Sequence, residues 1–115
     1  MWIYITVSVF ILFDILTGLC KGIYLGELNS TKLRKGLFHK LSEVIAVVGS
    51  GLLEYGIIYI NLNIDFPILK VVVTYICVTE LISILENLCV INPSLAKLFK
   101  PYLEKLKEKG DSENE

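Results

Sequence analysis

The first 25 residues decide the fold, and they read MWIYITVSVFILFDILTGLCKGIYL (Met1–Leu25). A bilayer core of roughly 30 Å needs about 20 mostly apolar helical residues to cross it. Two further apolar blocks of sufficient length follow, Leu41–Ile60 and Phe66–Val90. Runs such as VSVFIL lack the period-2 alternation of a half-buried strand, and isolated segments in lipid satisfy their backbone groups only as helices. The sequence therefore predicts an all-α integral membrane protein with three transmembrane helices, over residues 2–25, 41–60 and 66–90 of a membrane domain 1–92.

The overall composition agrees with this class and excludes others. Of the 115 residues, 54% are hydrophobic and the mean hydropathy is +0.64, whereas a net charge of −1 predicts no nucleic-acid partner. The three cysteines lie inside the apolar blocks without metal-ligand spacing, and the single histidine, His39, lies in a basic loop. No cofactor, metal site or catalytic constellation is expected, so the sequence does not predict an enzyme. The first block has no basic n-region and Asp14 interrupts it, so we expect a retained span rather than a signal peptide.

Basic residues predict the orientation. They gather between the first two spans and after the third, whereas the link 61–65 has none. Lysine and arginine favour the cytoplasmic side of a membrane, so the N-terminus is predicted outside and the C-terminus in the cytoplasm. The residues expected at the membrane surface are Lys32, Arg34, Lys35, Lys40, Lys97 and Lys100.

The chain changes character after the third span. Asn92 suits a helix cap and Pro93 the first helical position. Apolar residues then recur at helical spacing among lysines and glutamates, which predicts a C-terminal cytoplasmic amphipathic helix over 93–109, kinked at Pro101. It could lie on the inner membrane surface or be an ordinary cytoplasmic helix. Residues 110–115 are predicted to be a disordered acidic tail.

Polar and charged residues inside the spans are the candidate functional residues. A charge near the centre of a membrane helix costs about 2.5–3.5 kcal/mol on insertion scales, so such residues face protein or water. In each span they fall on one side, which indicates either a pore lining or structural ion pairs that set helix register. We expect Lys21 to pair with Glu86, Glu43 or both, and Lys70 to snorkel or reach Glu54. The candidate pore-lining residues are Asp14, Thr17, Lys21, Glu43, Ser50, Glu54, Glu80, Ser83, Glu86 and Asn87.

Small residues follow a regular spacing in the first span. Gly18, Gly22 and Gly26 form a GxxxGxxxG run, which lets helix backbones approach closely in lipid. The run predicts a helix-packing seam, either within one chain or between chains.

Three segments carry a family resemblance. The stretch 14–22 (DILTGLCKG) resembles the first-span signature of the phage-lysis and toxin-secretion holins. The stretch 33–41 (LRKGLFHKL) is similar to the basic first loop of that family, and 80–88 (ELISILENL) to its third-span ending. The chain departs from the pattern at Thr79 and Leu81, where the family often has Asn and Gly, and its N-terminus is very short.

The resemblance implies a holin that oligomerises in the bacterial cytoplasmic membrane. The pore of such a protein releases a muralytic endolysin during host lysis, or a large toxin, and the cargo passes without specific binding. The implied partners are further copies of the chain, the lipid bilayer and an antiholin. The residues leave two alternatives open: a small proton-coupled membrane transporter, and an antiholin or other regulatory membrane subunit.

Overall fold

The computed structural model describes residues 1–61 and 65–114, with side chains to Lys109, and its regular elements there are four helices. They are α1 (Trp2–Leu25), α2 (Ser30–Tyr59), α3 (Ile68–Ile91) and α4 (Pro93–Asn114). The first three are long and apolar enough to cross a membrane, which confirms the predicted all-α membrane fold. Large hydrophobic side chains such as Leu12, Ile45 and Leu52 are about half exposed or more on the outside of these helices. Such an outer surface is suited to lipid.

Helix α2 is longer than the predicted second span. It begins at Ser30, eleven residues before the expected start, because Asn29 caps it with a side-chain oxygen that accepts a hydrogen bond from Lys32 N at 2.8 Å. Thirty residues at 1.5 Å each give a length of about 45 Å, more than a hydrocarbon core requires. Residues that were expected in a basic loop are therefore the first turns of a helix.

The turn between α1 and α2 depends on Gly26. This residue has φ 68°, in the left-handed region, and the N–H of Glu27 donates to the carbonyl of Gly22 at 3.0 Å. This is a common way to end a helix, and glycine suits it because it has no Cβ to clash. Gly26 is therefore a helix terminator, and within the chain a Cβ added there would meet no atom within 4 Å, so a seam at Gly26 stays a prediction for packing between copies.

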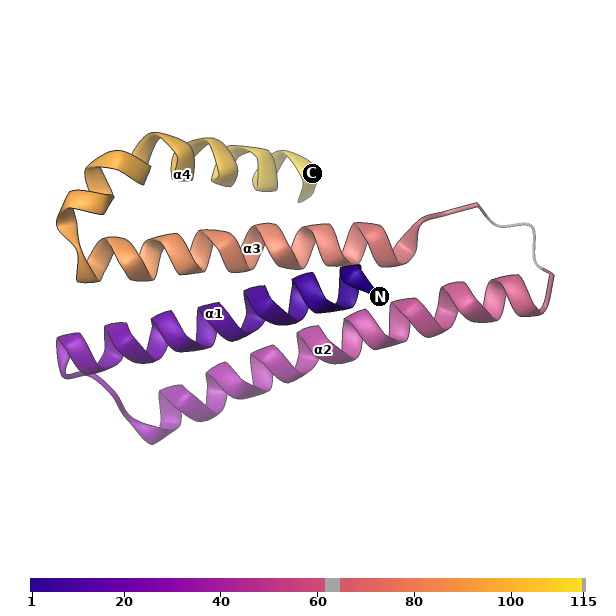
Figure 1. The fold of residues 1–115 in the computed structure, drawn as a ribbon, viewed down its shortest axis with the longest axis horizontal. Coiled ribbons are helices and arrows are strands. Elements are labelled where there is room, and N and C mark those ends of the chain that lie inside the picture. Colours follow the sequence, from indigo (N-terminus) through magenta and orange to yellow (C-terminus); the bar gives the residue numbers. More distant parts are fainter. Residues whose placement is uncertain (62–64, 115) are drawn as a thin grey trace.

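Helix α3 is the central helix and packs against each of the other three. The buried core consists of Val7 and Ile11 from α1, Val47 from α2, and Val73 and Ile76 from α3. Helices α1 and α2 are in contact near Gly51, where an added Cβ would meet the Tyr4 hydroxyl. Figure 1 shows α1 and α2 diverging from there toward the end where α1 stops, α2 begins and α3 passes into α4. We call this the basic end.

Helix α4 turns back along α3 (Figure 1). Asn92 Oδ1 accepts the Ser94 N–H at 3.1 Å, which confirms its capping role. The half-buried side of α4 carries Leu95, Phe99, Leu103 and Leu106.

The sequence left open a helix on the membrane surface or an ordinary cytoplasmic helix, and it did not predict that α4 packs against α3. Lys107 Nζ lies 2.7 Å from Glu86 Oε1 of α3, an ion pair between side chains that are about half exposed. This contact raises the pKa of the Lys107 ammonium above its ordinary value. The helix contains Pro101 and continues past residue 109 to Asn114, through most of the predicted tail.

We expect opposite effects from alanine at two glycines. Gly26→Ala should destabilise the protein by about 1–2 kcal/mol, because an L residue is strained at positive φ. Gly36→Ala should stabilise it by roughly 0.5–1 kcal/mol, because Gly36 lies inside α2 with open space around it. Unfolding of the reconstituted protein in increasing sodium dodecyl sulfate, followed by circular dichroism, measures both. Equal effects would contradict the assignment of Gly26 as the terminator of α1.

Candidate intramembrane site

Three spans meet at the ammonium of one lysine. Lys40 of α2 forms ion pairs with Asp14 of α1 and with Glu80 of α3, the latter at 2.5 Å between Nζ and Oε2. Asp14 and Glu80 lie at the middle of their helices, with twelve residues before and eleven after each. The residue Glu80 is only 1% exposed. A charge this deep in a membrane helix requires a partner, and Lys40 supplies it for both carboxylates.

A third carboxylate, that of Glu43, lies beside this lysine. Its Oε1 is 3.9 Å from Lys40 Nζ and 2.9 Å from Nε2 of His39, one helical turn earlier. Its second oxygen, Oε2, is buried without a hydrogen-bond partner. Asp14, Lys40, Glu43 and Glu80 are called the Lys40 cluster below. It holds three carboxylates against one ammonium, so even a protonated His39 leaves an excess of negative charge if all three ionise.

Neutral polar groups complete the contacts of Asp14. Asn87 of α3 donates from Nδ2 to Asp14 Oδ1 at 3.3 Å and to Thr17 Oγ1 at 3.1 Å. An added Cβ at Gly18 would lie 3.7 Å from the same Asn87 nitrogen, so the glycine leaves room for this contact. The predicted polar sides of the first and third spans therefore face each other inside the chain.

The cluster also has the donor types of a metal site. Ligand atoms of His39, Glu43 and Glu80 lie within 4.8 Å of one another. A divalent ion at this spacing would compete with the Lys40 ammonium, which already contacts Glu80 and lies near Glu43. The lysine occupies the cation position of this arrangement, so the geometry favours an internal ion-pair network.

Several predicted pairings are wrong. Lys21 forms no ion pair among the described residues; it lines a cavity between α1 and α2 instead. Its expected partners Glu86 and Glu43 contact Lys107 and His39. Lys40 was expected at the membrane surface, yet its side chain is only 14% exposed. The longer α2 brings Lys40 to Asp14, Glu43 and Glu80, whereas the partner of Glu86, Lys107, comes from α4.

Glu54 has a different partner from the one expected. Its Oε1 accepts the backbone N–H of Leu69 at 3.0 Å, in the first turn of α3. The first N–H groups of a helix lack intrahelical acceptors, and a carboxylate there also complements the helix dipole. Glu54 thus joins the far end of α2 to the start of α3, and of the two alternatives for Lys70, a contact with Glu54 is not among the ion pairs of the described residues, whereas the exposed lysine fits the other.

The remaining candidate residues lie outside the cluster. Ser50 donates to its own helix, to Ala46 O at 2.7 Å, and Ser83 lines the cavity between α1 and α2. Gly22 lines the same cavity and contacts Leu28 rather than another helix. The other basic residues predicted at the surface are exposed: Lys32, Arg34, Lys35, Lys97 and Lys100.

Sequence reasoning missed Lys40 because hydropathy begins to rise only at Leu41. A helical signal was nevertheless present in the spacing. Lys40, Glu43 and Val47 follow one another at three and four residues, which places them on one face of a continuous helix. Asn29 is a good helix cap at the right distance upstream.

Removal of the lysine charge should destabilise the fold strongly. We expect Lys40→Met to cost about 3–5 kcal/mol, because three carboxylates then lose their only ammonium partner. Lys35→Met removes the same charge from an exposed position of α2 and is the matched control. Adding Glu80→Gln to Lys40→Met should restore part of the loss. Detergent unfolding curves of the four proteins check this, and equal curves for the two lysine variants would refute it.

The comparison with known proteins agrees with this architecture. No curated protein and no solved structure matches the chain. The family model described as "Bacteriophage holin family" matches residues 1–108, which include the three spans, the Lys40 cluster and most of α4. The chain therefore belongs to the bacteriophage holin family.

Proposed function

We propose that this chain is a holin that oligomerises in the bacterial cytoplasmic membrane and opens a pore for a muralytic endolysin or a large toxin. Its family membership supports a holin-type membrane protein. The observation that carries the proposal further is the Lys40 cluster. Three membrane-spanning helices each contribute a charged group to one buried point, and the charges do not balance when all three carboxylates are ionised.

The single chain has the features of a closed form. The charged groups at mid-membrane depth, Asp14 and Glu80, turn inward, and many large apolar side chains lie on the outside of the spans. A chain of this kind can accumulate in lipid without leakage, because no water path is required. The predicted lining residues are thus candidates for exposure only after the helices rearrange.

The excess of carboxylates in the Lys40 cluster favours a rearrangement of the helices. A buried carboxylate oxygen without a donor, Glu43 Oε2, is costly in a medium of low dielectric and inexpensive in water. In a ring of several copies, α1, α2 and α3 could turn their polar sides toward a shared aqueous lumen. The trigger would then be the density at which contacts between copies replace the contacts of Lys40.

The proposed orientation places the basic end in the cytoplasm. Exposed Arg34, Lys35 and Lys97 belong to segments at this end, and such residues favour the cytoplasmic side. The N-terminus then lies outside, and α3 passes into α4 at the cytoplasmic end. Reaction of single introduced cysteines with a membrane-impermeant maleimide, in a background without Cys20, Cys77 and Cys89, tests this orientation.

The time of lysis tests the role of the Lys40 cluster. Loss of a carboxylate and loss of the lysine should change this time in opposite directions. Glu80→Leu or Asp14→Leu removes surplus negative charge while Lys40 keeps two of its three carboxylates, so lysis should be delayed or abolished. Lys40→Met removes the ammonium that holds the helices together, so lysis should come earlier, whereas Lys40→Arg should keep the original time. The measurement is culture turbidity during co-expression with a cytoplasmic muralytic enzyme.

The control for timing is Glu104→Leu, which removes one negative charge from exposed α4. Membrane fractions on immunoblots confirm equal insertion of all variants. Unchanged lysis times in both acid variants would count against the proposal, as would delays no longer than that of Glu104→Leu.

The same expression system separates the alternative functions. A holin produced with the enzyme lyses the cell, whereas an antiholin does not and delays lysis by a second holin. Liposomes that contain the purified protein should release dextrans of protein size. Proton-driven uptake without release of large dyes would instead indicate a small transporter.

A further inference from the structure

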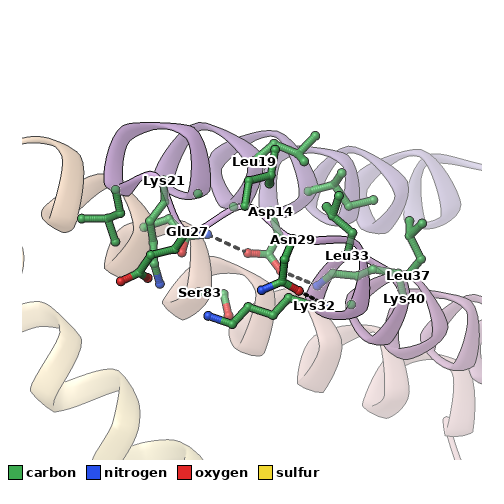
Figure 2. Close-up of a pocket in the computed structure, with 17 residues that line it drawn as sticks. Asp14, Leu19, Lys21, Glu27, Asn29, Lys32, Leu33, Leu37, Lys40 and Ser83 are labelled. Atoms are coloured by element: carbon green, nitrogen blue, oxygen red, sulfur yellow. Dashed lines mark hydrogen bonds and ion pairs between the residues drawn. The ribbon is translucent and has the colours of Figure 1, made fainter.

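A cavity of about 400 Å³ lies between α1 and α2 near the basic end. Its walls come from the last three turns of α1, the connection that follows, and the first three turns of α2, while Ser83 and Asn87 of α3 contribute from behind. Figure 2 shows Lys21, Lys32 and Glu27 at one side of it and the contact of Asp14 with Lys40 within it. The cavity thus adjoins the Lys40 cluster.

The absence of side chains at three positions creates this space. Gly18, Gly22 and Gly36 line the cavity, and an added Cβ at Gly36 would meet no atom within 4 Å. The two helices diverge toward this end (Figure 1), and the cavity lies between them. Gly18 and Gly22 of α1 border this space, although Gly18 also faces Asn87 of α3.

The cavity is lined by both apolar and charged side chains. Leu25, Leu28, Leu33 and Leu37 supply apolar walls. Lys21 and Lys32 supply two ammonium groups that form no ion pair among the described residues. Glu27 is the one carboxylate of the lining outside the Lys40 cluster, so a single positive charge remains uncompensated.

We propose that this cavity binds one anionic phospholipid, whose phosphate lies between Lys21 and Lys32 and whose acyl chain lies along the glycines and leucines. The depth fits, because Lys21 is four residues from the end of α1, about 6 Å, and Lys32 is two residues from the start of α2. Basic pockets between transmembrane helices are suited to acidic headgroups. The inference stands apart from pore formation, since it concerns the single chain.

A lipid in this position has a consequence for the Lys40 cluster. Asp14 and Lys40 line the cavity, so an acyl chain there would keep water away from their ion pair. In a medium without water this pair is stronger. The bound lipid would therefore stabilise the arrangement of α1 and α2 that the structure shows.

Native mass spectrometry of the detergent-solubilised full chain tests the proposal. The protein is titrated with phosphatidylglycerol and, separately, with phosphatidylcholine of the same acyl chains. We expect one tightly held phosphatidylglycerol per chain. The double variant Lys21→Gln/Lys32→Gln should bind it about 30-fold more weakly, as expected for two lost contacts of a basic side chain with an anionic lipid.

The matched control is Arg34→Gln/Lys35→Gln, which removes two positive charges from α2 at exposed positions outside the cavity lining. It should bind the lipid as the natural chain does. Equal loss of phosphatidylglycerol in both double variants would mean that any positive charge on α2 attracts the lipid, and it would overturn the proposal. Equal binding of phosphatidylglycerol and phosphatidylcholine would mean that the lipid is ordinary boundary lipid, and it would overturn the proposal too.

A second pair of variants tests the cavity while all lysines remain. Gly36→Leu places a side chain into the space, whereas Gly49→Leu places one on α2 outside the lining, and neither Cβ meets an atom within 4 Å. The bound phosphatidylglycerol should be lost in the first variant and retained in the second. Retention in both would overturn the proposal. If the protein forms a dimer in either lipid and Gly36→Leu abolishes that dimer, the cavity is occupied by a second copy of the chain. That outcome would also overturn the proposal.

Discussion

The structure depends on one ammonium group placed among three carboxylates where lipid allows no water. Lys40 is the only basic residue of the Lys40 cluster, and it contacts Asp14 on one side and Glu80 on the other. Each carboxylate alone would make its helix costly to insert. Together with the lysine they become a link between helices, because each ion finds its counterion on a neighbouring span. The register of α1, α2 and α3 follows from this requirement.

This requirement also explains the unequal lengths of the spans. Asp14 and Glu80 lie at the middle of α1 and α3, whereas Lys40 has ten helical residues before it and nineteen after it. When these charges meet, α2 extends beyond its neighbours at the far end, as Figure 1 shows. Stacked Tyr55 and Tyr59, with ring centroids 6.3 Å apart, occupy that extension, and tyrosines are common at membrane interfaces.

The same contacts connect the site to the proposed function. A network with more carboxylates than ammonium groups holds the closed chain together but leaves Glu43 Oε2 unsatisfied. Such a network is stable only while water is excluded. The cavity beside it, bordered by Gly18 and Gly36, is the nearest route by which lipid or water could reach Asp14 and Lys40. The ion pairs of the Lys40 cluster, the cavity beside them and the register of the three helices therefore depend on one another.

By itself the sequence determined the fold class, the three spans and the residues whose chemistry is unusual. Hydropathy is a local property, so α1 was predicted to its last residue and Glu80 was recognised as a buried charge. The tertiary structure alone decided the pairings: Lys40 meets Asp14 and Glu80, Glu54 caps α3, and α4 lies along α3. The reason is that an ion pair depends on the axial register and rotation of separate helices. In lipid the register and rotation are set by which charges on different helices can reach each other. The spacing of residues within a single helix does not give the distance between charges on two helices.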